Sequence, residues 1–232
     1  MILGLVVGSF LNVCISRIPE EASIVYPPSH CPKCKTKLKV KDLIPLFSYL
    51  MLRGRCRYCN EKISIRYPVV EALTALLFLV FCIKAGFSIH YLSLIALSVL
   101  LILISFIDVE HFVIPDFLVL IGIAVGVAYS IYSGSLMDSL IGICFGFLFM
   151  FLLGTAAKYA LKKEALGDGD IKLMVMLGAN LGIEKAALAV LGASVLGAAV
   201  GMLLIVLNYR KMEDYIPFAP FLALGAVVSI LI

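Results

Sequence analysis

Two aspartates stand where apolar stretches meet polar sequence, and a close pair of carboxyl groups in such a place could hydrolyse a peptide bond. Asp108 follows the uncharged run from Tyr91 to Ile107, and Asp170 precedes the apolar segment from Ile171 to Leu181. In a close pair, one carboxyl keeps its proton while the other is ionised. The ionised member can activate water and the protonated member can polarise the peptide carbonyl. Asp108 and Asp170 are therefore candidates for an aspartyl protease pair.

The polar sequence after Asp108 holds three rival residues. Asp116 follows Pro115 and opens the next apolar segment, where an acid caps a helix start without any catalytic role. Glu110 and His111 lie closer, but no serine or cysteine nucleophile is placed to use the imidazole. An acid at the C-terminal end of a helix, as expected for Asp108, opposes the helix dipole and calls for another explanation.

Asp170 has a rival inside its own motif, Gly167-Asp-Gly-Asp170. Asp168 lies two residues away and carries the same chemistry, so the residues alone leave the choice open. The two glycines allow a bend and a close backbone approach, which could bring an acid of this motif against a neighbouring helix. Taken singly, Asp108 or Asp170 is more simply explained as an ordinary acid at a helix end.

Four of the seven cysteines form two pairs, Cys31-Pro-Lys-Cys34 and Cys56-Arg-Tyr-Cys59, separated by 21 residues. Two such pairs can surround a tetrahedral Zn²⁺ ion with four thiolates. The surrounding loop has little apolar content, so we expect the metal to stabilise the fold rather than to catalyse. Two disulfides are the rival interpretation, and the compartment decides between them. The other three cysteines lie in apolar segments and are expected to be small buried residues: Cys14, Cys82 and Cys144.

The composition requires a membrane around most of the chain, because 62% of the 232 residues are hydrophobic and only 15% are charged. Six apolar segments are roughly long enough to cross the hydrocarbon as helices, and two more are shorter. We therefore expect an all-α, polytopic membrane protein with about eight transmembrane helices. The predicted segments are Ile2–Ile15, Tyr67–Ile83, Tyr91–Ile107, Phe117–Tyr132, Ser139–Ala157, Ile171–Leu181, Ala186–Asn208 and Tyr215–Ile232.

The distribution of basic residues predicts the orientation. Eleven of the nineteen Lys and Arg residues lie between Arg17 and Arg66, in a stretch with only four acids, which marks this loop as cytoplasmic. Threading eight spans from it puts seventeen basic residues inside, including Lys162, Lys163, Arg210 and Lys211, and two outside. Both candidate acids then face the cytoplasm, and a reducing compartment disfavours disulfides. Because topology and contacts with membrane lipids explain the basic residues, no nucleic-acid partner is expected.

Three parts of the chain follow from this pattern. Residues 1–16 form a first membrane helix, which we expect to be retained because no basic segment precedes it and no small-residue cleavage site follows it. Residues 17–68 form a cytoplasmic, cysteine-rich loop like a zinc ribbon. Residues 69–232 form a membrane core with both candidate acids.

Several motifs follow one another in order along nearly the whole chain. They are Gly8-Ser-Phe-Leu-Asn-Val13 with Arg17 and Pro19, Cys31-Pro-Lys-Cys34, Asp42-Leu-Ile-Pro45, Arg53-Gly-Arg-Cys56 with Cys59, Arg66-Tyr-Pro68 with Glu71, Asp108 with Ile114-Pro-Asp116, and Gly167-Asp-Gly-Asp170. This ordered combination resembles the bacterial type IV prepilin peptidases, which are also called prepilin leader peptidases and N-methyltransferases and are aspartyl proteases with a Gly-x-Gly-Asp motif.

The resemblance implies that Asp108 and Asp170 are the catalytic pair, in preference to Asp168. It implies cleavage of prepilins or pseudopilins at the cytoplasmic face of the bacterial inner membrane, between a basic leader and the hydrophobic helix that follows. Many members of the family then methylate the new N-terminus with S-adenosylmethionine, and the cysteine-rich loop would be the methyltransferase part. The resemblance alone carries this second activity, because the sequence has no dinucleotide-type glycine loop.

Two other functions are compatible with parts of the sequence. A general intramembrane protease, similar to presenilin or signal peptide peptidase, would share the Gly-x-Gly-Asp motif but not the cysteine-rich loop. A membrane adaptor with a zinc ribbon would bind a partner through its basic loop and perform no chemistry, with the aspartates as topological residues. Cleavage of a prepilin distinguishes the three.

Overall fold

The computed structural model describes residues 1–161, 166–207, 209 and 216–232, and within these ranges every regular element is a helix. Two isolated antiparallel bridges, His30 with Lys37 and Arg55 with Lys62, supply the β-type pairing in this part of the chain. The expected all-α class is confirmed. Some residues used above in the charge count and in the span boundaries lie outside the described residues: Lys162, Lys163, Asn208, Arg210, Lys211 and Tyr215.

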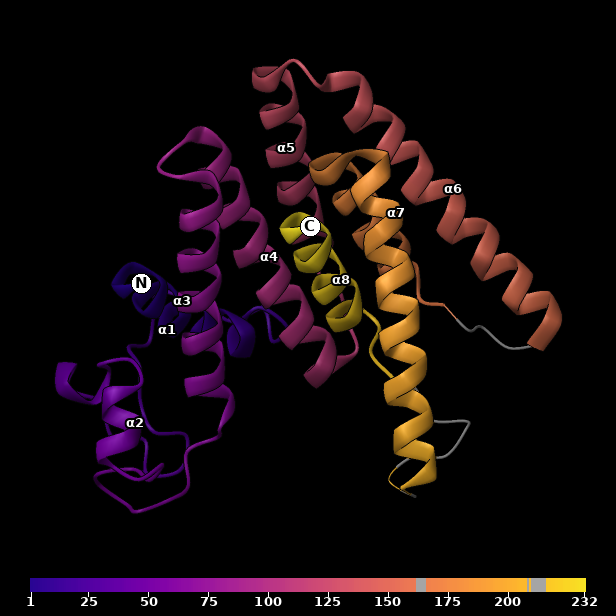
Figure 1. Cartoon of the computed structure of the whole chain (residues 1–232). Coiled ribbons are helices and arrows are strands. Elements are labelled where there is room, and N and C mark those ends of the chain that lie inside the picture. The colour runs from indigo at the N-terminus through magenta and orange to yellow at the C-terminus, as the bar shows by residue number, and fades with distance from the viewer. Residues whose placement is uncertain (162–165, 208, 210–215) are drawn as a thin grey trace. The chain divides into compact units, whose positions relative to one another are not determined.

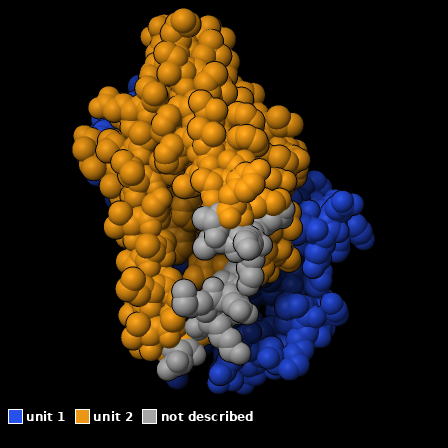
Figure 2. All heavy atoms as spheres, turned by 90° about the vertical axis from the view of Figure 1, so that its right-hand side faces the viewer, with its two compact units in different colours: residues 1–91 blue, residues 92–232 orange. Residues whose placement is uncertain are grey.

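The chain divides into two compact units, residues 1–91 and residues 92–232, which Figure 2 colours separately. Unit 1 contains two apolar helices, α1 (Ile2–Arg17) and α3 (Arg66–Ala85). Between them lies the cysteine-rich loop with a single 3₁₀ turn, η1 (Val40–Asp42), and a short helix, α2 (Phe47–Met51).

Helices α1 and α3 pack backbone to backbone through two glycines one turn apart on α1. A Cβ atom added at Gly4 would lie 2.7 Å from the Cα of Ala75, and one added at Gly8 would lie 2.7 Å from the Cα of Glu71. Small residues at this spacing let two helices approach closely in an apolar environment. The close approach holds the start of α3, including Glu71, against α1.

Unit 2 is a bundle of helices in which α7 is central (Figure 1). Its helices are α4 (Ile89–His111), which begins just before the unit boundary, α5 (Asp116–Ser133), α6 (Leu136–Leu161), α7 (Asp168–Val206) and α8 (Ala219–Leu231). Helix α7 contacts α5, α6 and α8. Its first half is buried on several faces, through side chains that have no exposed surface: Leu173, Met174, Met176 and Leu177.

Five of the described helices are long and apolar enough to cross a membrane, namely α3, α4, α5, α6 and α7, whereas α1 and α8 are apolar but shorter. Helix α7 changes direction at Gly182, whose backbone is not helical (φ 73°, ψ 177°). The two predicted segments Ile171–Leu181 and Ala186–Asn208 therefore lie on one bent helix. With α7 counted twice, the eight predicted segments correspond to seven helices, and α7 begins at Asp168, two residues earlier than Asp170.

Candidate active site and metal centre

The structure brings the two predicted aspartates together inside unit 2. Asp108 lies in the last turn of α4 and Asp170 in the first turn of α7. The two side chains are close enough for their charges to interact. Both residues are buried, with 7% and 8% of their surface exposed. Two buried carboxyl groups whose charges interact cannot both ionise easily, so one of them favours its protonated form.

The backbone at three chain segments holds this pair in place. The amide of Ala219, the first residue of α8, donates a hydrogen bond of 3.2 Å to Oδ2 of Asp108. The amide of Asp170 donates to the carbonyl of Gly167 at 3.1 Å, which begins the helix at the motif. A Cβ atom added at Gly169 would lie 3.0 Å from the Cβ of Ile114, so the second glycine of the motif allows the α4–α5 loop to pack closely against it.

The rivals of these two acids lie on exposed surface. Glu110, His111, Asp116 and Asp168 are all exposed, so the burial separates Asp170 from Asp168 although the residue types do not. The helical period of α7 could have distinguished the two acids from the sequence. Asp170 lies three, four and seven residues before the buried Leu173, Met174 and Leu177, whereas Asp168 falls on another face.

Asp116 instead takes part in an ion pair at the start of α5. Its Oδ1 accepts a hydrogen bond of 2.7 Å from Nζ of Lys172 on α7, and both side chains are about half exposed or more. An exposed pair of this kind contributes less than about 1 kcal/mol to folding.

We therefore expect Asp116→Asn and Lys172→Gln each to lower the free energy of unfolding by less than about 1 kcal/mol, because solvent screens this pair. The double variant should lower the free energy of unfolding by no more than the sum of the two single effects. A double-mutant cycle on thermal unfolding in detergent measures the coupling energy between the two residues. A coupling energy of several kcal/mol would contradict the screened-pair interpretation.

A groove of about 540 Å³ lies between α5, α6 and α7 and is lined by Asp168 and Ile171 from the start of α7, but not by Asp108 or Asp170. Its walls are apolar, and Asp116, Asp168 and Lys172 gather at one end. The rings of Phe147 and Phe151 on α6 lie stacked at its edge, with centroids 5.7 Å apart. The remaining apolar lining is Val119, Leu120, Ile123, Ile171 and Val175.

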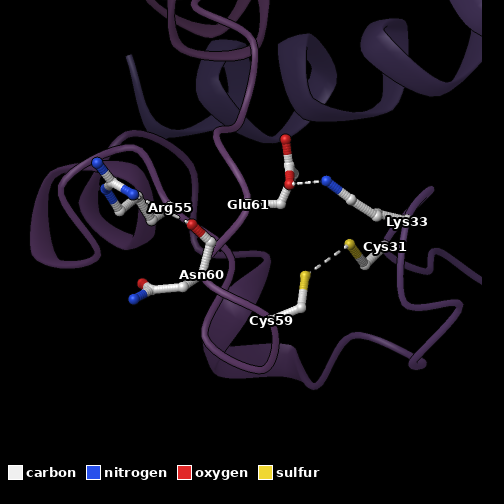
Figure 3. A network of polar contacts seen from close by, with 6 residues as sticks. All are labelled: Cys31, Lys33, Arg55, Cys59, Asn60 and Glu61. Atoms are coloured by element: carbon white, nitrogen blue, oxygen red, sulfur yellow. Dashed lines mark hydrogen bonds and ion pairs between the residues drawn. The ribbon is translucent and has the colours of Figure 1, made fainter.

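The four predicted cysteine ligands converge in unit 1. The sulfur atoms of Cys31, Cys34, Cys56 and Cys59 all lie within 4.8 Å of one another, and the sulfurs of Cys31 and Cys59 are 3.8 Å apart (Figure 3). Four sulfurs at this spacing can hold a metal ion, and the donor set is compatible with zinc. The two pairs thus form one site from two segments.

Each cysteine pair sits on a turn of the same design. In the first, the amide of Lys35 donates to the carbonyl of Cys31 at 2.9 Å; in the second, the amide of Asn60 donates to the carbonyl of Cys56 at 3.0 Å. Lys35 and Asn60 both adopt positive φ, 57° and 63°. Each turn is closed by one of the two antiparallel bridges. This repeated turn aims both sulfurs of a pair at one point.

The thiols differ in acidity because their neighbours differ. Hydrogen bonds from the side chain and backbone of Thr36 lower the pKa of Cys34 to about 6. The backbone of Glu61 lowers the pKa of Cys59, but burial and the adjacent thiols outweigh this and raise it to about 12. Cys34 and Cys59 therefore do not ionise alike, whereas a bound dication would let both act as thiolate ligands.

Polar contacts outside the sulfur cluster join the two turns. Lys33, in the first turn, forms an ion pair with Glu61, in the second (Figure 3). Arg57 also donates to Oδ1 of Asp42 at 2.6 Å, and Tyr58 to Oδ2 at 2.9 Å. Burial raises the pKa of Asp42, but these hydrogen bonds and one from the backbone more than offset it, so that this carboxyl has a pKa below its usual range. The second turn is thereby tied to η1.

Comparisons with known proteins find similarity over almost the whole chain. A model of the bacterial peptidase A24 N-terminal domain matches residues 2–85, and a model of the type IV leader peptidase family matches residues 95–202. A prepilin leader peptidase/N-methyltransferase of Myxococcus xanthus is 40% identical over 211 residues, which cover 90% of this chain but 63% of that protein. No solved structure matches.

Two further relatives match over most of their own length. Proteins of the same name from Pectobacterium carotovorum and Pseudomonas putida are 38% and 34% identical. Each alignment covers 99% of this chain, together with 91% and 88% of the respective relative.

Proposed function

Since this chain belongs to the type IV leader peptidase family, we propose that it removes the basic leader from prepilins or pseudopilins with Asp108 and Asp170 as its catalytic pair. The observation that carries this proposal is the burial of both acids, with their charges close enough to interact, within the region that matches the family model, residues 95–202. Exposed acids nearby do not share this environment.

In the proposed reaction, one carboxylate accepts a proton from water as the oxygen attacks the scissile carbonyl. The protonated partner donates a hydrogen bond to the carbonyl oxygen. Collapse of the tetrahedral intermediate breaks the C–N bond, and the leaving amine takes a proton from the pair. The Ala219 amide keeps one oxygen of Asp108 occupied, so the other oxygen is the one oriented to serve the reaction.

The groove between α5, α6 and α7 supports a substrate of this chemistry. Its apolar walls suit the hydrophobic helix that follows the cleavage site in a prepilin, and Asp168, which lines the groove with the Asp116–Lys172 ion pair, suits the basic leader. We assign the groove to substrate binding, because the first turns of α7, which hold Asp170, also supply part of its lining.

We assign the four-cysteine cluster to a structural Zn²⁺ ion. All four ligands are supplied by Cys31, Cys34, Cys56 and Cys59, which completes a tetrahedral shell and leaves no open position for a reacting water. The metal would supply folding energy to a loop with few buried apolar residues.

We also propose that the enzyme methylates the new N-terminus with S-adenosylmethionine, as the names of its relatives state for those proteins. The site for this donor belongs to residues outside the aspartate pair. The positive charge of the loop supports a cytoplasmic location for both activities in a bacterial inner membrane.

Membrane vesicles of opposite orientation test this function. Inverted vesicles expose the cytoplasmic face, so a prepilin added from outside should be cleaved by inverted vesicles and not by right-side-out vesicles. Mass spectrometry of the product reads both the loss of the leader and the gain of a methyl group. No cleavage in either orientation would refute the peptidase proposal and favour a membrane adaptor, and cleavage only by right-side-out vesicles would reverse the topology.

A further inference from the structure

Unit 1 contains a pocket of about 550 Å³ that the peptidase chemistry does not use. Its walls come from α1, the cysteine-rich loop with α2, and the start of α3. This volume is in the range of sites for small molecules and cofactors. The residues that matter for its chemistry are Phe10, Asn12, Lys35, Ser48, Tyr49 and Glu71.

Glu71 places a buried carboxyl group on the wall of this pocket, with 6% of the residue exposed. Its Oε2 accepts a hydrogen bond of 2.8 Å from the amide of Leu46, and the hydroxyl of Ser9 also donates to it. Both donors are neutral, and within the described part of the chain no Lys, Arg or His side chain pairs with it. A buried carboxylate is costly without a positive charge nearby. The wall at Glu71 is therefore suited to a cation, whereas Arg17 and Lys35 line other parts of the pocket.

Asn12 adds a second acceptor to the same wall. The residue is 1% exposed, and its Nδ2 donates to the carbonyls of Gly8 at 3.3 Å and Tyr67 at 3.1 Å. These two contacts fix the orientation of the carboxamide, since its oxygen could not face two carbonyls. The oxygen, Oδ1, is buried and has no hydrogen-bond partner. Buried polar atoms are almost always paired, so this one calls for a donor group from a bound molecule.

We propose that this pocket binds the sulfonium methyl donor S-adenosylmethionine, with Glu71 facing its positively charged part. This assignment rests on the methylation included in the proposed function. The aromatic rings of Phe10 and Tyr49 suit a nucleoside base, and Lys35 offers a positive charge to a carboxylate. When bound, such a donor supplies a methyl group: the terminal amine forms a bond to the methyl carbon, the carbon–sulfur bond breaks to leave a thioether, and the extra proton on nitrogen passes to water.

Binding of two related nucleosides separates a charge role of Glu71 from a structural one. Equilibrium dialysis with the full chain in detergent, loaded with zinc, measures S-adenosylmethionine, which carries the sulfonium charge, and S-adenosylhomocysteine, which is a neutral thioether. Glu71→Gln keeps an acceptor for the Leu46 amide but removes the charge. We expect it to weaken binding of the charged donor by about tenfold or more and to leave the neutral analogue within about twofold. The matched control is Glu21→Gln, an exposed acid outside the pocket, which should change neither.

A second variant tests the pocket by filling its volume and leaves Glu71 unchanged. Ser48 on α2 lines the pocket, so Ser48→Met should fill it and weaken both nucleosides, whereas Leu50→Met on the exposed face of the same helix should weaken neither. The inference is overturned if Glu71→Gln weakens both ligands equally or neither, or if Ser48→Met leaves both unchanged.

Prepilin cleavage by the wild type, measured in parallel, keeps the two proposals distinct. A wild type that cleaves prepilin but binds neither nucleoside overturns the pocket assignment and leaves the peptidase proposal standing. A wild type that binds the charged donor through Glu71 but cleaves nothing supports the pocket and refutes the peptidase.

Discussion

Asp108→Asn and Asp170→Asn should each abolish leader cleavage, with a loss of at least about 10³-fold in the cleavage rate. An amide cannot accept a proton from water or share one with the other carboxyl, and acid–base catalysis by a positioned group contributes about 10²–10⁴-fold. Asparagine is nearly isosteric with aspartate, and in Asp108→Asn the oxygen of the new carboxamide can still accept the Ala219 hydrogen bond. We therefore expect both variants to fold, with thermal unfolding in detergent as the check and single-turnover cleavage of a prepilin as the readout.

Two acids on α7 serve as controls for this pair. Asp168→Asn changes the exposed neighbour of Asp170 at the end of the groove, so we expect at most about a tenfold loss, through weaker attraction of the basic leader. Glu184→Gln changes an exposed acid beyond the bend of α7 and should leave cleavage unchanged. Full cleavage by Asp108→Asn or Asp170→Asn would remove that residue from the pair. Loss with Asp168→Asn and retention with Asp170→Asn would move the second acid by two positions.

Removal of the metal should unfold the cysteine-rich loop. Structural zinc sites in small domains supply about 10–16 kcal/mol of apparent binding free energy at neutral pH, and this loop has few buried apolar side chains to replace it. Protein purified without chelators should carry about one Zn²⁺ per chain. Cys31→Ser and Cys56→Ser should each lose most of it, and protease sensitivity between residues 20 and 65 should rise in both variants and after chelation.

The chain offers a matched control for the cysteine variants. The expectation that Cys144 is buried is wrong, because this cysteine is exposed on α6. It lies outside the cluster, so Cys144→Ser should keep the metal and the protease resistance. A wild type that contains no metal, or a Cys31→Ser variant that retains a full equivalent, would exclude a site built from these four sulfurs.

The sequence allowed the chemistry of both centres to be predicted, because their signals are local. Two cysteines separated by two residues define half of a metal site on their own, and an acid at the end of an apolar run is visible in a single window. The structure confirms that the four sulfurs converge. The roles of Asp108 and Asp170 stay predictions that the variants above would test.

Other features of the candidate sites depend on hydrogen bonds between residues far apart in the sequence, which leave no local signal. The amide of Ala219 reaches Asp108 across 111 positions of the chain, and Glu71 receives the amide of Leu46 across 25. Backbone donors have no residue type that a pattern could detect. The sequence pattern also predicts two separate spans where the structure has one helix bent at Gly182. Two apolar segments separated by a glycine look like two spans.

The hydrogen bond from α8 to Asp108 links the completion of this site to the order in which the helices are synthesised and inserted into the membrane. Helix α8 carries no acid and no cysteine, yet its first amide donates a hydrogen bond to Asp108 of the proposed catalytic pair. Ribosomes deliver α4, α7 and α8 to the membrane in that order, so both acids are in place before the segment that clamps one of them. If the pair acts as proposed, a nascent chain should thus remain a latent protease until the thirteen residues of α8 have left the translocation machinery and docked.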